Sequence, residues 1–340
     1  MKRNIFNTLS ALIVALLCAL CFNYAVSAAD KTAAKDPLRG IPFSDPKKIF
    51  KMSDEWIKAP IKYESWAKGA DIAVALDQQI YPALLPLIRE YEKQNGLKIA
   101  VEEGTCGIAA GAVSKKTVDI SGMCCPPGEV DRLPGLKYLN LGIGSLAILV
   151  NKDNPVENIS TADLRNIFRG KVDKWSQLKT DKKAQDIEIK PIIRLHCKNR
   201  PGHWCLLLGS EDLFSPRAMD VGSIADMLAQ VASVKGAVGY ETLWMVDHHN
   251  KNSVLKALSI DGYSPYDNSA LISGKYNIYR TFNITAWNAP NLINEKAAKL
   301  VDYIMKNLER IDKSYYIVPA TELRKAGWKF DGNELVGEPN

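Results

Sequence analysis

The sequence predicts an α/β protein in which strands and helices alternate and build a sheet with crossover connections. Short apolar runs are followed repeatedly by segments that carry apolar residues at helical spacing. Such alternation is typical of parallel strands joined by helices. The chain has 340 residues, more than a single hydrophobic core usually serves, so we expect two lobes.

Between residues 71 and 150 the pattern predicts at least four strands and two helices. A helix should start between Pro82 and Pro86 and end at Gly96, because glycine favours the left-handed turn that closes a helix. A second, alanine-rich helix follows the turn at Thr105 and covers 108–116. The expected strands are 72–76, 97–101, 118–120 and one or two within 136–150.

A second set of elements begins at Ser160, which is suited to cap a helix over 162–168 that ends at Gly170. The rest is predicted from the same periodicities. We expect strands at 187–193 and 237–240, helices at 224–234 and 294–308, and extended chain at 276–287.

Residues 1–29 have the features of a secretory signal peptide. Lys2 and Arg3 precede an apolar run from Leu9 to Phe22, which is shorter than the ~20 residues that span a bilayer. Small residues then offer a cleavage site. The expectation is an exported, periplasmic protein that is not embedded in the membrane, with a polar extension over 30–68.

The charge distribution argues against a nucleic-acid partner. The formal net charge is +6, and charges of both signs are interspersed rather than gathered in a basic stripe. This balance is compatible with a small anionic ligand.

Three stretches carry a resemblance to a known family: Leu164–Trp175, Leu146–Pro155 and Lys235–Tyr240. The first matches the family's helix-turn-Trp signature. In these stretches the chain resembles the phosphate-binding subunits of bacterial ABC uptake systems, which are two-lobed periplasmic solute-binding proteins, and the similarity runs over about 71–328. These are scaffold motifs, so they indicate fold more strongly than ligand.

The resemblance implies a type II periplasmic-binding-protein fold: mixed sheets flanked by helices and two crossings between lobes. Lobe 1 would comprise 69–150 and 265–340, and lobe 2 would comprise 151–264. It also implies a binding protein rather than an enzyme, with no required cofactor and with an ABC permease or a membrane sensor as partner.

The family's ligand-binding turns differ in this chain. The Ser/Thr-rich first turn is replaced by one containing Gln78 and Gln79, and Cys106 takes a serine-like place in the second turn. Cys124 stands where the family has the aspartate that accepts the proton of phosphate. Arg194 matches the family's arginine, but the Ser-Gly-Thr turn that should follow it is absent.

We therefore expect an oxyanion site in the cleft between lobes, because helix N-termini and arginine bind anions whatever the neighbouring side chains are. The expected ligand-binding residues are Gln78, Gln79, Thr105, Cys106, Gly107, Cys124, Cys125, Arg194, His196 and Cys197.

The cysteines leave two alternatives open. Of seven, Cys18 and Cys21 fall in the leader, and four of the remaining five lie in the ligand-binding turns. Thiols and an imidazole select soft ions, so Cu, Zn or arsenite could be held by Cys106, Cys124, Cys125, Cys197 and His196. Disulfides are the other alternative, pairing Cys197 with Cys205 and Cys106 with Cys124 or Cys125.

Catalysis is disfavoured. His196 and Cys197 are adjacent, and neighbouring side chains in an extended segment point apart instead of forming a nucleophile–base pair. His248 and His249 lie in a polar stretch that is typical of a solvated loop.

Overall fold

A computed structural model of the protein describes residues 36–179 and 186–339. The expected signal peptide, and with it Cys18 and Cys21, lies outside the described residues. Leu38–Asn340 forms one compact unit.

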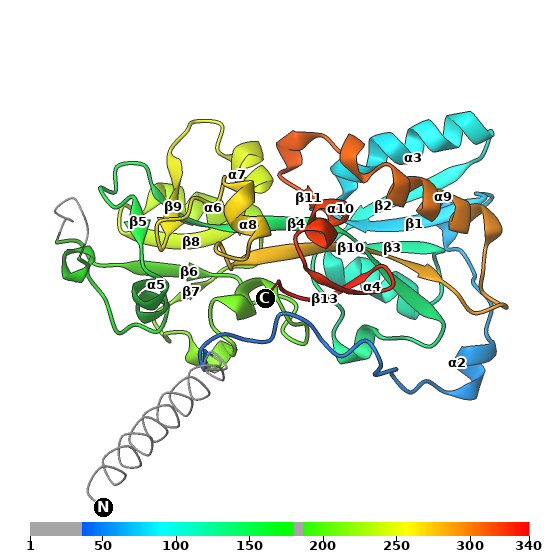
Figure 1. Ribbon diagram of the computed structural model, residues 1–340, viewed down its shortest axis with the longest axis horizontal. Helices are drawn as coiled ribbons and strands as arrows, with labels where there is room; N and C mark the ends of the chain where they lie inside the picture. Colours follow the sequence, from blue (N-terminus) through cyan, green and yellow to red (C-terminus); the bar gives the residue numbers. More distant parts are fainter. Residues whose placement is uncertain (1–35, 180–185, 340) are drawn as a thin grey trace, which may run out of the picture. The chain divides into compact units, whose positions relative to one another are not determined.

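The elements alternate as the sequence predicts, and Figure 1 follows them along the chain. The strands are β1 (Ile72–Asp77), β2 (Ile99–Gly104), β3 (Ile120–Met123), β4 (Leu136–Asn151), β5 (Asn158–Ile159), β6 (Lys190–Ile193), β7 (Met219–Asp220), β8 (Ala237–Thr242), β9 (Leu255–Ile260), β10 (Tyr279–Trp287), β11 (Val318–Pro319), β12 (Lys329–Asp331) and β13 (Glu334–Gly337). The α-helices are α2 (Asp54–Lys58), α3 (Tyr81–Asn95), α4 (Cys106–Ser114), α5 (Thr161–Phe168), α6 (Ile224–Ser233), α7 (Leu243–His249), α8 (Asn268–Ile272), α9 (Glu295–Lys306) and α10 (Ala320–Lys325).

The main sheet is mixed rather than purely parallel. Its central order is β2-β1-β3-β10-β4-β8-β6-β7. The β1, β2 and β3 strands are mutually parallel, as are β6, β7 and β8, whereas β10 and β4 pair antiparallel with their neighbours. A mixed α/β sheet flanked by helices agrees with the predicted fold class.

The 16-residue strand β4 joins the two ends of this sheet (Figure 1). Its residues up to Ser145 pair with β10, and from Leu146 onward it pairs with β8 and β9. Apart from a bulge at Leu141, β4 is therefore paired along its whole length. The division of the chain into lobes at residues 150 and 265 stays a prediction.

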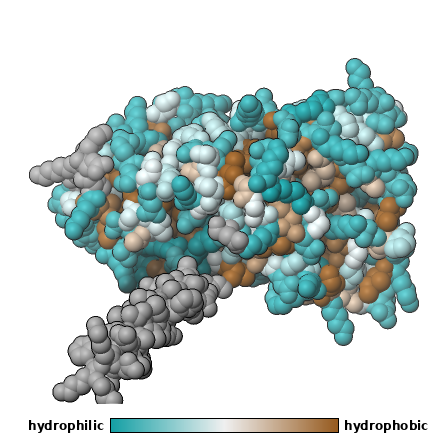
Figure 2. All heavy atoms as spheres, viewed as in Figure 1, coloured by the Kyte–Doolittle hydropathy of each residue, from teal (hydrophilic) through white to brown (hydrophobic). Residues whose placement is uncertain are grey.

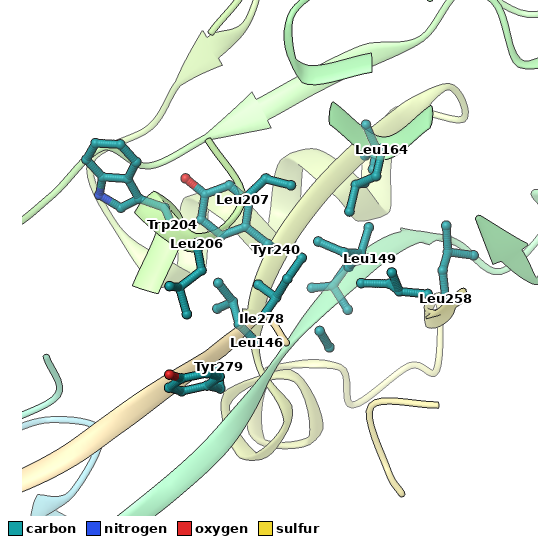
Figure 3. Packing of buried hydrophobic residues seen from close by; sticks show 14 of the residues in the cluster. Leu146, Leu149, Leu164, Trp204, Leu206, Leu207, Tyr240, Leu258, Ile278 and Tyr279 are labelled. Atoms are coloured by element: carbon teal, nitrogen blue, oxygen red, sulfur yellow. The ribbon is translucent and has the colours of Figure 1, made fainter. Parts of the chain in front are cut away.

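Apolar side chains pack in two large clusters, one toward each end of β4. The first gathers around the second half of β4 with β8, α5 and α6; Figure 3 shows Leu146, Leu149 and Tyr240 within it. The second gathers around β1, α3, α9, the first half of β4 and the middle of β10. Tyr91 on α3 and Tyr303 on α9 hold these two helices together, with ring centroids 5.0 Å apart.

The face seen in Figure 2 is largely hydrophilic, with apolar residues scattered over it. Within the described part of the chain, no helix has the length and apolarity needed to cross a membrane.

Several predicted boundaries differ from the structure. The first helix begins at Tyr81 and keeps Pro86 inside it, because a proline near the helix start removes only one backbone hydrogen bond. Of the one or two strands expected within 136–150, the structure has one, which ends at Asn151. His248 and His249 end helix α7 instead of lying in a loop, because its buried face continues through Val246.

Candidate functional site

Four chain segments meet where the parallel strands end. The turns after β1, β2 and β3 lie at one edge of the sheet because these strands run in register and in the same direction. The segment that follows β6 approaches them from the other end of the sheet. Ligands of open α/β sheets bind at such carboxyl edges.

A cavity of about 550 Å³ opens between these segments. The residues that line it come from the four segments, from the start of α6 and from the end of α7. They are Asp77, Gln78, Gln79, Thr105, Cys106, Gly107, Cys124, Arg194, His196, Cys197, Arg200, Gly222, Ser223, Ile224, Ala225 and His249.

Three buried cysteines form a cluster beneath the cavity. The sulfur atoms of Cys106, Cys124 and Cys125 all lie within 4.8 Å of one another. Cys106 opens helix α4, while Cys124 and Cys125 directly follow β3. Strand β3 packs closely against Ile80 because Gly122 has no side chain: a Cβ atom there would lie 2.4 Å from the Cδ1 of Ile80.

Cys197 adds a fourth thiol from the segment after β6. The Nη1 of Arg200 lies 3.4 Å from its Sγ and 3.5 Å from the Sγ of Cys106. Arg200 also forms a bidentate ion pair with Asp131, at 2.6 and 2.7 Å. Cys197 and His203 both adopt positive φ, at 54° and 42°. Left-handed backbone at residues other than glycine costs energy and concentrates at functional sites.

Arg280 on β10 lies behind the cluster and is only 1 % exposed. Its Nη1 donates to the Sγ of Cys124 at 3.1 Å and lies 3.8 Å from the Sγ of Cys125. Its Nη2 is 2.7 Å from the Nε2 of His196. Among the described residues, no carboxylate lies within ion-pair distance of this guanidinium, so its charge faces sulfur and imidazole.

The thiols divide into two electrostatic classes. Hydrogen bonds from the Cys106 and Cys125 thiols, aided by the charge of Arg280, hold the pKa of Cys124 well below its usual range despite burial. Hydrogen bonds from the same two thiols, with His196 and Arg200 nearby, lower the pKa of Cys197. The pKa of Cys106 is raised, first by its hydrogen bond to Cys124, and burial raises the pKa of Cys125. Thiols and thiolates therefore share hydrogen bonds within one cluster.

Arg194 is held by a buried carboxylate. Its Nη2 donates to the Oε2 of Glu241 on β8 at 3.0 Å. Gln79 reaches the same strand, with its Nε2 3.4 Å from the other oxygen of Glu241 and its Oε1 accepting from Thr242 at 3.0 Å. These contacts join the turn after β1 to the strand β8.

His196 and His203 stack beside the thiols, with ring centroids 5.4 Å apart. Burial, reinforced by the charges of Arg280 and Arg194, lowers the pKa of His196 to about 4. His196 is therefore neutral, with Nδ1 2.9 Å from the carbonyl of Arg194 and Nε2 placed to accept from Arg280. His203 is fully buried, and neither ring nitrogen has a hydrogen-bond partner among the described residues.

Two helix N-termini border the cavity. Thr105 caps α4, and Ser223 caps α6 by accepting from the backbone N–H of Asp226 at 3.0 Å. The first backbone N–H groups of a helix lack intrahelical acceptors and carry the positive end of its dipole. Asp77 also lines the cavity, and burial and then the nearby Cys124 raise the pKa of its carboxyl.

The structure brings the residues that were expected from the sequence to one place. Nine of them line the cavity, and Cys125 lies behind it in the thiol cluster. All five described cysteines are free thiols, so neither disulfide alternative is formed. Cys205 is buried away from the cluster, where its thiol approaches the carbonyl of Arg200 at 3.8 Å.

Other site residues were missed from the sequence. The start of α6 carried a usable signal, since Gly222-Ser223 precedes an apolar helix. Arg200 follows the exposed residues Lys198 and Asn199 but is itself only partly exposed, because it pairs with Asp131. Arg280 and Glu241 lie in strands far along the chain and have no local signal.

Sequence comparisons give the chain's relatives. A family model described as a PBP superfamily domain matches residues 62–307. The phosphate-binding protein PstS of Bacillus subtilis is 24% identical over 280 residues, covering 77% of this chain and 85% of that protein. Phosphate-binding protein PstS 2 of Streptococcus pneumoniae is 27% identical over 120 residues, so the matched stretch spans only 40% of that protein.

Solved structures agree at the level of the fold. A phosphate transport receptor from Vibrio cholerae has a TM-score of 0.57 at 20% identity, covering 73% of this chain and 100% of that one. A putative phosphate ABC transporter substrate-binding protein from Clostridium perfringens, solved with bound phosphate, has a TM-score of 0.61 at 15% identity, covering 73% and 99%. With most of its length matched by the family model, this chain belongs to the PBP superfamily.

Proposed function

We propose that this protein is an exported solute-binding protein that captures a small oxyanion of the phosphate class for ABC transport or for a membrane sensor. The observation that carries the proposal is the cavity itself. It gathers two helix N-termini with the guanidinium groups of Arg194 and Arg200. Backbone N–H groups at helix starts and bidentate guanidinium groups are the standard protein partners of oxyanions.

Cationic side chains at the cavity support an anionic ligand. Arg194 and Arg200 line the cavity, where each also pairs with one carboxylate, Glu241 or Asp131, and the buried guanidinium of Arg280 lies beside Cys124. Burial raises the pKa of the Asp77 carboxyl, which weakens the repulsion that an anion would meet there.

The relatives support the same class of cargo, because PstS of Bacillus subtilis and PstS 2 of Streptococcus pneumoniae are named phosphate-binding proteins. The proton-accepting aspartate of that family is replaced by Cys124, and a thiol is a weak donor and a weak acceptor. We therefore expect phosphate affinity below that usual for the family. This binding would serve transport, with a permease as partner, or sensing, with a membrane receptor as partner.

Calorimetric titration with phosphate, arsenate, sulfate and molybdate tests the proposal. Arg194→Gln should weaken binding of the preferred anion about ten- to a hundredfold, the usual worth of a charge-assisted hydrogen bond. Arg217→Gln is the matched control, because Arg217 is an exposed residue outside the cavity. Absence of binding for every anion, or equal loss in both variants, would overturn the proposal.

A further inference from the structure

We propose that Cys106, Cys124 and Cys125 form a binding site for one divalent thiophilic metal ion, with Zn²⁺ as the reference ion. This site goes beyond the oxyanion-binding function, because its ligands are sulfur atoms and not helix N-termini or arginines. The sequence left open whether these thiols pair as disulfides or bind a soft ion. The free thiols of the structure leave the sulfur atoms available.

Distances between the sulfurs suit a shared ion. Zinc binds thiolate sulfur at about 2.3 Å, so two sulfurs on one tetrahedral ion lie about 3.8 Å apart. The three sulfur atoms already fall within 4.8 Å of one another. Small side-chain rotations therefore close the set around an ion.

Burial and access are both appropriate for such a site. The three residues are 3 %, 2 % and 0 % exposed, which excludes competing water from the sulfurs. Cys106 and Cys124 also line the cavity, so an ion can enter through it. The cavity side leaves room for a fourth ligand.

The surrounding guanidinium groups select the charge of the ion. Hydrogen bonds from neighbouring groups to the ligands orient and tune metal sites, and Arg280 makes such contacts with Cys124 and Cys125. Three thiolates on a divalent ion carry a net charge of −1, which matches the single charge of Arg280. Three thiolates on a trivalent metalloid are neutral and would leave that buried charge uncompensated, which is costly.

Two other polar neighbours, Arg200 and His196, leave this count unchanged. The charge of Arg200 is balanced by Asp131, so it adds no net charge near Cys106. His196 hydrogen-bonds between Arg194 and Arg280 and is not required as a ligand.

The test uses the full chain, reduced and freed of metal with a chelator under anaerobic conditions. Zn²⁺ affinity is measured by chelator competition, and Co²⁺ reports thiolate ligation through its charge-transfer absorption. We expect one ion per chain with thiolate-to-cobalt absorption. Cys125→Ser should lower Zn²⁺ affinity by more than the 10- to about 100-fold typical of losing a group that only hydrogen-bonds to a ligand.

Cys205→Ser is the matched control, because Cys205 is also a buried free thiol but lies outside the cluster. It should bind Zn²⁺ as the unmodified chain does, and circular dichroism should show both variants folded. Equal affinity in Cys125→Ser, or equal loss in Cys205→Ser, overturns the site. Binding of Cu(I) or arsenite with no binding of Zn²⁺ overturns the assignment to a divalent ion.

Phosphate titration of the same variants separates this inference from the proposed function. Cys125 does not line the cavity, so Cys125→Ser should keep its anion affinity within a few-fold while losing Zn²⁺. Loss of anion binding in Arg194→Gln with Zn²⁺ binding intact would show that the two sites are independent.

Discussion

The guanidinium of Arg280 donates a hydrogen bond to the sulfur of Cys124 at 3.1 Å, although the two residues are 156 positions apart. Antiparallel pairing of β10 with β3 places them together, with Asn283 opposite Met123. A fully buried cation beside a thiol favours the thiolate. This relationship connects the electrostatics of the site to the stability of the protein.

Stability should depend on Cys124 in a pH-dependent way. Its folded-state pKa lies below the ordinary value near 8.5, so between these values the unfolded chain binds one more proton than the native chain. The contribution of Cys124 therefore rises with pH up to about 8.5, by at most about 1.4 kcal/mol per pH unit, and is lost as pH falls through the folded pKa. Urea unfolding of Cys124→Ser against the unmodified chain at several pH values measures it.

Cys205→Ser should show the opposite sign. Burial raises the pKa of Cys205 to about 12, so its contribution is present below about pH 8.5 and is lost above that value. The variant should therefore gain stability relative to the unmodified chain only in alkaline solution. A parallel pH dependence in the two cysteine variants would contradict this electrostatic account.

His196 should destabilise the protein in acid. Its pKa of about 4 lies below the ordinary 6.5, so stability is fully present above pH 6.5 and falls as pH drops toward 4. The loss of unfolding free energy is at most about 3 kcal/mol. Solvent screening reduces it further, because the ring is only half-buried. His196→Asn should flatten this acid limb in denaturant unfolding between pH 4 and 7. The exposed His248→Asn is the control and should leave the limb unchanged.

Glu241→Gln should strengthen oxyanion binding. The carboxylate balances Arg194 at 3.0 Å, and glutamine keeps the hydrogen bond while removing the negative charge. We expect roughly tenfold tighter binding of the preferred anion, equivalent to about 1.4 kcal/mol of relieved repulsion. Glu334→Gln provides the control, because Glu334 pairs with Arg132 outside the cavity. Calorimetry that finds unchanged or weaker binding in Glu241→Gln would argue against an anion at Arg194.

Two matched serine caps separate helix stability from binding. Ser223 accepts from Asp226 N–H at 3.0 Å at the cavity, and Ser160 accepts from Asp163 N–H at 3.0 Å on α5. Replacing either with alanine should cost about 1 kcal/mol of unfolding free energy. Only Ser223→Ala should also weaken anion binding, because α6 borders the cavity and α5 does not. Thermal unfolding measures the loss of stability in both variants, and calorimetry measures their anion affinity. Equal anion affinity in the two variants would show that α6 does not contribute to the site.

Local features of the site could be read directly from the sequence. Ser160 marks the start of helix α5 and Gly170 follows its end. Both act through hydrogen bonds and backbone geometry that depend only on neighbouring residues. The cysteines could be placed at strand ends for a similar reason, and parallel strands bring such ends to one edge. The same reasoning, applied to Gly222-Ser223, would have assigned the start of the helix predicted at 224–234 to the site.

What the sequence by itself determined was the α/β class, the capped helices and the set of turns at which polar and thiol groups gather. These depend on periodicity and on interactions between residues a few positions apart. Only the tertiary structure decided that Arg280 faces Cys124, that Glu241 balances Arg194 and that Arg200 is buried against Asp131. Each of these contacts joins segments distant in the chain, and its partner is selected by strand pairing and by the need to compensate a buried charge.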